Sequence, residues 1–276
     1  MSIKIGVALT GGTFMPEVKV EETESSTAFE RLQSGYRLAM DMGYNYVEAT
    51  AGELMALSEE ELADLAGKVK IGELAFRYIN SFVPMDLKIC TEKTSVLKDY
   101  ASRSIGRAAA LGVRGIVVGS GVARKRPEGM SPMEGLKKFA DFVDICADIA
   151  AKHGLNIVLE PLNRVETNVL NSVAEGADLV HWLDRPNVLL LADAFHMALE
   201  GETVEDILNN EDIISHLHIS EAPGRVYPGK IGGPYLKELG AALKKEYFAK
   251  DVTVECGFDD FAVEAAAALK YVREVF

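Results

Sequence analysis

Short apolar runs alternate with longer amphipathic runs along the whole chain. The apolar runs have the length of strands, and the segments between them repeat apolar residues every three or four positions, as helices do. Eight strands are predicted, at Ile3–Ala8, Tyr44–Ala49, Leu74–Phe82, Gly115–Gly119, Asn156–Glu160, Val188–Asp193, Ser215–Ser220 and Val252–Glu255. Strands that alternate with helices favour βαβ units and a parallel sheet.

Signals for helix starts and ends fall between these strands. Three segments have the form of a capping box, in which a hydroxyl and an acidic side chain bond each other's backbone N–H groups: Ser58–Glu61, Ser131–Glu134 and Thr203–Asp206. Three glycines are placed to end helices in the left-handed conformation: Gly43, Gly112 and Gly154. The pattern therefore predicts helices between the strands from one end of the chain to the other.

Eight such units fit a closed (β/α)8 TIM barrel, which typically has about 250 residues. The chain has 276 residues and no linker-like segment, so residues 1–276 are predicted to form a single domain. The alternative is an open, doubly wound sheet. It is disfavoured because the first strand is followed by Gly11 and Gly12 alone, without the GxGxxG fingerprint of dinucleotide-binding sheets.

Charge and composition narrow the class of protein. The net charge is −13, from 29 Lys and Arg against 42 Asp and Glu, so nucleic acid is not an expected partner. The chain has neither a secretory signal pattern nor an apolar run of the roughly 18 residues that a membrane span needs. Three cysteines give no disulfide framework. We expect a soluble, cytoplasmic protein that does not bind membranes.

Four predicted strands in the second half of the chain end on side chains that can bind a metal ion. These are Glu160, Asp193, His218 and Glu255. They are 33, 25 and 37 residues apart, about one βα unit each. Because the carboxyl ends of barrel strands meet at one mouth, we expect the four side chains to converge there.

Side-chain alternation supports this convergence. In a strand, every second residue faces the same side. His216 and His218 therefore share one face, while Leu217 and Ile219 face the helices. A charged group that ends an apolar strand is costly to bury unless it is solvated, paired or bound to a cation. Three carboxylates and an imidazole, without a thiolate, favour Mn²⁺, Mg²⁺ or Co²⁺ over a structural zinc.

Several longer motifs resemble a known family. The segment 160–171, which reads EPLNRVETNVLN, resembles the signature of the D-tagatose 3-epimerase and D-psicose (allulose) 3-epimerase group. That group belongs to the xylose isomerase-like TIM-barrel superfamily. Segments 193–197 (DAFHM), 216–221 (HLHISE) and 254–258 (VECGF) resemble its later strands in the same order. The resemblance is dense from about residue 155 to 260 and looser before that.

The resemblance implies roles for individual residues. Glu160 and Glu255 match metal ligands that also form the acid/base pair, and Asp193 and His218 match the other two ligands. The positions that contact the sugar in that family are matched by Glu166, His196 and Arg225, the last of them one residue later than in the family pattern. The implied cofactor is a divalent ion, with Mn²⁺ first and Mg²⁺ or Co²⁺ as alternatives. The implied assembly is a homo-oligomer, a dimer or tetramer.

These residues predict a metal-dependent sugar isomerase or epimerase, with a ketose 3-epimerase first. Loss of a proton beside a ketone requires that the charge of the resulting enediolate be stabilised, and a divalent cation does this as a Lewis acid. One glutamate would remove the proton and the other would return one to the opposite face.

Three alternatives stay open. One is a metal-dependent dehydratase or lyase that acts on a keto-inositol or a keto sugar. Another is an endonuclease of the apurinic type, disfavoured by the negative charge and by the small number of histidines, five. The last is a non-catalytic barrel subunit, against which the complete ligand set argues.

Other polar residues have more than one interpretation. Glu48 ends the second strand facing inward, where it would contact the substrate, support the site from behind or be a plain charge at the rim. His216 is expected one layer below the metal-facing positions, in a buried hydrogen bond. The basic segment 124–126 (RKR) could bind an anionic group of the substrate, but a solvated loop is the expectation.

Overall fold

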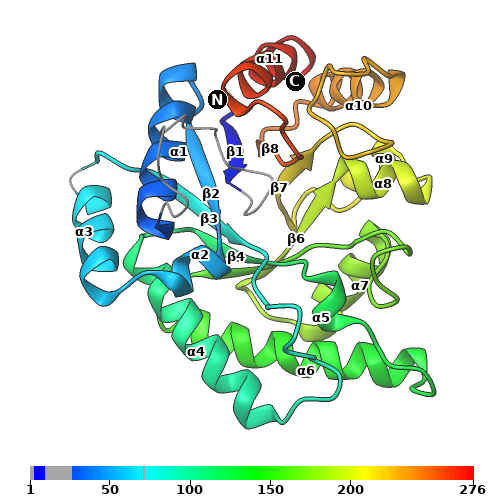
Figure 1. The fold of residues 1–276 in the computed structure, drawn as a ribbon. Helices are drawn as coiled ribbons and strands as arrows, with labels where there is room; N and C mark the ends of the chain where they lie inside the picture. The colour runs from blue at the N-terminus through cyan, green and yellow to red at the C-terminus, as the bar shows by residue number, and fades with distance from the viewer. Residues whose placement is uncertain (1–2, 10–26, 71) are drawn as a thin grey trace.

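The computed structural model describes residues 3–9, 27–70 and 72–276, and within them eight parallel strands close into a barrel (Figure 1). The predicted (β/α)8 fold is confirmed, while the glycines at 11 and 12 lie outside the described residues. The strands are β1 (Ile5–Leu9), β2 (Tyr46–Thr50), β3 (Phe76–Asn80), β4 (Gly115–Val118), β5 (Asn156–Leu159), β6 (Val188–Asp193), β7 (Ile214–Ile219) and β8 (Asp251–Val254). Each strand pairs with the next, and β8 pairs with β1.

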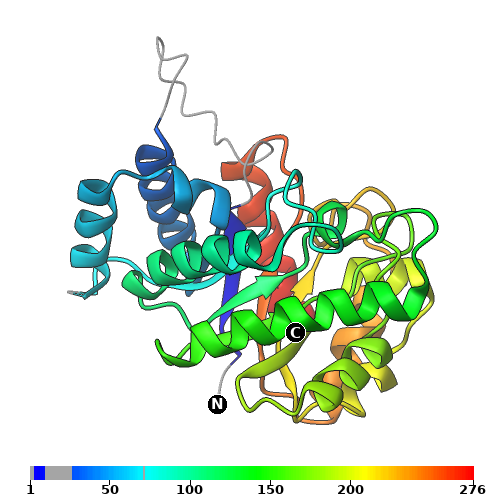
Figure 2. The same ribbon diagram turned by 90° about the horizontal axis from the view of Figure 1, so that it is seen from below.

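Helices surround the barrel on its outer side (Figures 1 and 2). They are α1 (Ala28–Met42), α2 (Ala51–Ala56), α3 (Glu59–Lys70), α4 (Thr94–Ala110), α5 (Gly121–Arg124), α6 (Pro132–Ala151), α7 (Val173–Leu183), α8 (Ala194–Glu200), α9 (Val204–Leu208), α10 (Pro234–Lys245) and α11 (Phe261–Val275). Within the described residues, no helix has both the length and the apolar character needed to cross a membrane.

The predicted helix signals act as expected. Ser131 and Glu134 exchange both capping-box bonds at the start of α6, and Ser58 and Glu61 do the same at the start of α3. For the third motif, the N–H of Thr203 donates to Asp206. The three predicted glycines adopt positive φ angles, between 62° and 97°. Local sequence therefore sets where the helices begin and end.

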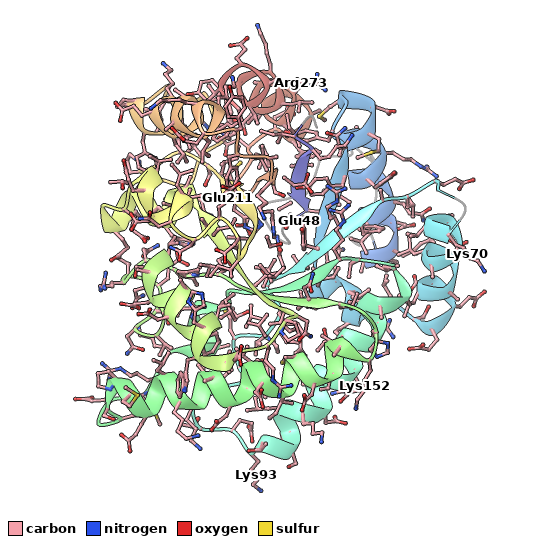
Figure 3. The ribbon with its side chains drawn as sticks, turned by 180° about the vertical axis from the view of Figure 1, so that it is seen from behind. Glu48, Lys70, Lys93, Lys152, Glu211 and Arg273 are labelled. Carbon is pink, nitrogen blue, oxygen red and sulfur yellow. The ribbon has the colours of Figure 1, made fainter. Side chains whose placement is uncertain are left out.

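Residues that face the barrel axis form layers. A lower, mainly apolar layer contains Tyr46, Tyr78, Val117, Val158 and Leu191. Gly6 on β1 makes room for it, because a Cβ atom there would lie 2.2 Å from the Tyr46 ring. The next inward-facing positions, nearer the carboxyl ends of the strands, are polar. Figure 3 shows one of them, Glu48, in the middle of the ring of strands, while Lys70, Lys93, Lys152 and Arg273 lie at the periphery.

Candidate metal centre

The four residues predicted to bind a metal lie together at the carboxyl ends of the last four strands. Glu160 and Glu255 immediately follow β5 and β8, Asp193 ends β6, and His218 is the fifth residue of β7. One ligand atom from each lies within 4.8 Å of those of the other three. All four are at least 91% buried. The shortest contact in this group, which we call the metal cluster, joins His218 Nδ1 to Glu255 Oε2 at 2.9 Å.

Arg225 supplies one positive charge to the metal cluster. Its Nη2 donates to Asp193 Oδ2 at 2.8 Å and to Glu255 Oε2 at 2.5 Å. Burial lowers the pKa of Arg225, but the charges of Glu255 and Asp193 outweigh that effect and raise it, so the guanidinium stays charged. Three carboxylates beside one guanidinium leave two negative charges if His218 is neutral. A divalent cation has the charge that would cancel them.

Two pKa values in the cluster, those of Asp193 and His218, show the same shortage of positive charge. Burial raises the pKa of Asp193, and the Arg225 charge compensates only in part. For His218, burial favours the neutral ring, but the carboxylates of Glu255 and Glu48 outweigh burial and raise its pKa well above the usual range. A cation bound at Nδ1 would therefore displace a proton, as metal binding to histidine generally does.

Glu160 is shaped to accept a cation. Its Oε1 is buried and has no hydrogen-bond partner among the described residues; His218 Nδ1 lies 3.5 Å from it. Its Oε2 occupies the space beside Gly119, where a Cβ atom would lie only 2.0 Å from it. A buried carboxylate oxygen without a partner is costly unless it is bound to a cation. The residues present therefore fit a divalent metal site of oxygen and nitrogen ligands.

The three residues matched to sugar-contacting positions in the family lie beside this cluster. Asn163 links two of them, because its Nδ2 donates to Glu166 Oε1 at 3.0 Å and lies 2.8 Å from His196 Nδ1. The other ring nitrogen of His196 lies 3.2 Å from Arg225 Nη1. Both neighbours are donors and a neutral imidazole has one acceptor nitrogen, so only one of these contacts is a hydrogen bond. Burial and the Arg225 charge lower the pKa of His196 to about 4, which keeps the ring neutral.

The structure places Glu48 on the other side of His218 from the metal cluster. The side chain is fully buried, and its carboxylate oxygens contact His218, His216 and Thr253. Burial raises the pKa of Glu48, but the two histidines outweigh this effect and lower it below the usual range. His216 is also fully buried, in the hydrogen-bonded setting that its strand position predicts.

The solvated loop expected for segment 124–126 is wrong for Arg124, which is 0% exposed. Its guanidinium donates to three backbone carbonyls, those of Val118, Glu160 and Leu170. It thereby ties the end of β4 to the loop that carries the signature segment. Arg126 donates to the carbonyl of Met130, and only Lys125 is exposed. The burial of Arg124 cannot be predicted from the three basic residues alone, because two of its three carbonyl partners are distant in sequence.

Comparisons with known proteins identify the family of this chain. D-psicose 3-epimerase of Agrobacterium fabrum is 26% identical over 223 residues, which are 78% of this chain and 75% of that protein. Inosose isomerase of Bacillus velezensis is 25% identical over 237 residues, which are 81% of this chain and 82% of that protein. A crystal structure of D-psicose 3-epimerase in the presence of D-fructose has the same fold, with a TM-score of 0.79, 22% identity and 99% coverage of both chains. A family model described as xylose isomerase-like TIM barrel matches residues 36–274, and the chain belongs to that family.

Proposed function

We propose that this protein is a divalent-metal-dependent sugar isomerase or epimerase, and specifically a ketose 3-epimerase. The observation that carries the proposal is the metal cluster itself. It pairs two buried glutamates from separate strands, Glu160 and Glu255, with Asp193 and His218. The similarity to D-psicose 3-epimerase over three quarters of both chains supports the same reaction class.

The proposed ligands are Glu160, Asp193, His218 and Glu255, and the proposed metal is Mn²⁺, with Mg²⁺ and Co²⁺ as alternatives. The donor set of carboxylates and one imidazole suits such ions. When bound, the cation acts as a Lewis acid that stabilises negative charge on the substrate. Metal analysis of the purified protein, followed by reconstitution of the EDTA-treated protein with each ion, tests the choice.

In the proposed reaction, Glu160 and Glu255 move the proton at the carbon next to the substrate carbonyl. They come from β5 and β8, with β6 and β7 between them, and so approach the substrate from different parts of the mouth. One removes the proton, and the other returns a proton to the opposite face. Glu166, His196 and Arg225 are proposed to hold the sugar, since they lie at the edge of the metal cluster.

The test is deuterium incorporation from D₂O, followed by NMR, with a panel of free and phosphorylated ketoses. We expect exchange at C3 and a new C3 epimer with Mn²⁺ present, and no exchange with EDTA. Exchange without an epimer would favour an isomerase. Exchange on no sugar, despite bound metal, would contradict the substrate class.

A second candidate is a metal-dependent dehydratase or lyase that acts on a keto-inositol or a keto sugar. The similarity to an inosose isomerase favours including a keto-inositol in the panel. Enediolate formation is common to both reactions, and the dehydratase would then expel a hydroxyl group. Loss of water from the substrate would identify it.

We also propose that the protein is a cytoplasmic homo-oligomer, a dimer or tetramer. Its three cysteines are buried and free, which suits a reducing compartment. A groove of about 630 Å³ between α6 and α7 exposes Met133 and Trp182, with charges of both signs on its rim. In a two-fold interface the same patch of both copies meets, and we propose the exposed apolar residues at this groove as part of that patch.

Light scattering tests this assembly. We expect the M133E/W182E double variant to have a smaller mass than the wild type. Replacement of Tyr247, which is 89% exposed outside the groove, should leave the mass unchanged. An unchanged mass in the double variant would contradict the interface.

A further inference from the structure

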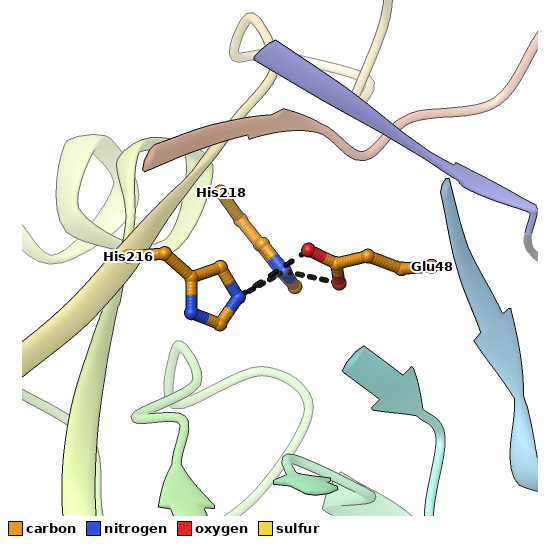
Figure 4. A group of neighbouring side chains, drawn as sticks. All are labelled: Glu48, His216 and His218. Atoms are coloured by element: carbon orange, nitrogen blue, oxygen red, sulfur yellow. Dashed lines mark hydrogen bonds and ion pairs between the residues drawn. The ribbon is translucent and has the colours of Figure 1, made fainter. Parts of the chain in front are cut away.

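A second buried group lies directly beneath the metal cluster and shares His218 with it. The group consists of Glu48, His216 and His218, all 0% exposed, and we call it the support group. Figure 4 shows Glu48 reaching from β2 across the barrel interior toward the two histidines of β7. His218 Nε2 lies 3.0 Å from Glu48 Oε2, and His216 Nε2 lies 3.4 Å from Glu48 Oε1.

Glu48 is held from other sides as well. Thr253 on β8 donates its hydroxyl hydrogen to Glu48 Oε1, and Tyr46 lies 2.7 Å from that same hydroxyl oxygen. His216 is fixed by parallel stacking on Tyr78, with ring centroids 3.8 Å apart and planes 8° apart. The carboxylate therefore has little freedom to turn toward the mouth of the barrel.

The two nitrogens of His218 face different partners. Nδ1 faces the metal cluster, 2.9 Å from Glu255, whereas Nε2 faces Glu48. A carboxylate only accepts hydrogen bonds, so the nitrogen in each of these two contacts carries a hydrogen. If a cation displaces the hydrogen on Nδ1, the hydrogen on Nε2 stays with Glu48, and the lone pair of Nδ1 faces the other ligands.

We propose that Glu48 is a positioning residue that holds His218 in the Nε2–H form, with Nδ1 presented to the cation. This inference rests on the metal site of the proposed function, but not on its substrate. It replaces the substrate contact that the sequence suggested for Glu48, because the imidazole of His218 stands between Glu48 and Glu255. Partners that orient a ligating histidine in this way commonly change metal affinity by about 10- to 100-fold when removed.

The test uses the full-length protein with Zn²⁺ as a diamagnetic probe. Glu48→Gln keeps the shape of the side chain but leaves one acceptor oxygen for donors from His218, His216 and Thr253. We expect the Kd for Zn²⁺, measured by calorimetry, to rise about 10-fold or more. In ¹⁵N-histidine-labelled protein with Zn²⁺ bound, the N–H correlation of His218 Nε2, assigned with His218→Gln, should shift or disappear.

Glu53→Gln is the matched control. Glu53 is also a mainly buried glutamate in the first half of the chain, but it contacts Arg31 and Thr50 away from the cluster. Thr253→Val removes one donor to Glu48 without a change of charge, and serves if Glu48→Gln does not fold; a smaller loss of affinity in the same direction is expected.

Zn²⁺ affinity and a His218 signal that both stay as in the wild type in Glu48→Gln would overturn the proposal. A higher KM for a sugar with unchanged Zn²⁺ affinity would instead restore the substrate contact. If no sugar reacts but Zn²⁺ affinity falls as expected, the positioning role stands and the proposed substrate class fails.

Discussion

The two halves of the barrel contribute to the site in different ways. Strands β5 to β8, with the residues directly after β5 and β8, carry every residue of the metal cluster. Strands β1 to β4 and the loops that follow them carry residues that support it: Glu48 beneath His218, Gly119 beside Glu160, and Arg124 on the carbonyl of Glu160. The second half thus holds the proposed metal ligands, and the first half supplies several of the contacts that position them. Substitutions in the two halves should therefore have different effects on catalysis, metal affinity and stability.

The largest expected effect is in the second half. Glu255→Gln removes a proposed acid/base group, while the amide oxygen of the glutamine can still bind a cation. General acid–base catalysis contributes about 10²- to 10⁴-fold, so we expect deuterium exchange into the substrate to fall by that factor. Bound metal, measured in parallel, should fall much less. Exchange near the wild-type rate in Glu255→Gln would remove Glu255 from the proposed mechanism.

A smaller effect is expected from Gly119→Ala, in the first half. The new methyl group would lie 2.0 Å from Glu160 Oε2, so the carboxylate would have to move. We expect metal affinity to fall about 10-fold, as for other residues that orient a ligand. Gly67→Ala on α3 is the matched control, because a Cβ atom there has no neighbour within 4 Å. Equal metal affinity in the two variants would mean that metal binding does not depend on the present position of the Glu160 carboxylate.

The contrast also explains what could be predicted from the sequence. Periodicity predicts the order of the eight strands, and a charged residue at the end of an apolar strand is visible without a structure, as at Asp193. The support from the first half depends on contacts distant in sequence. Glu48 and His218 are 170 residues apart, and Arg124 and Glu160 are 36 apart. No local pattern records such pairs, and for this reason the sequence predicts a solvated loop at Arg124.

The supporting role of Arg124 can be tested by measuring the stability of the folded protein. Arg124→Met removes the donors to three buried carbonyls. Those of Val118 and Leu170 still accept from backbone N–H groups, so the carbonyl of Glu160 loses most, at a cost of about 1–3 kcal/mol for a buried group left unsatisfied. Relief from burying the guanidinium offsets part of this, so we expect a net loss of about 1–2 kcal/mol in the free energy of unfolding. Urea unfolding of the EDTA-treated protein measures it. Lys125→Met, at the exposed neighbour, should change stability by less than about 0.5 kcal/mol. Similar stability of the two variants would contradict a supporting role.

The smallest expected effect lies in the second half but outside the metal cluster. Glu202 follows α8 and accepts from the N–H of Val173. Burial, together with the charges of Asp206 and Glu200, raises the pKa of its carboxyl from 4.5 to about 7. Because the folded state binds this proton more tightly than the unfolded chain, the group's contribution to stability is complete below pH 4.5. It is lost as the pH rises through 7.

Glu202→Gln keeps an acceptor for Val173 and removes the titration. In EDTA, the variant should unfold at a higher urea concentration than the wild type at pH 8, and this advantage should shrink at pH 5. Glu238→Gln, at an exposed glutamate that lines one surface groove together with Glu202, should show no such dependence on pH. If the Glu202→Gln advantage were equal at both pH values, Glu202 would not be the titrating group. Any pH dependence that remains in the Glu202→Gln protein would then be sought first among the buried carboxylates of the second half.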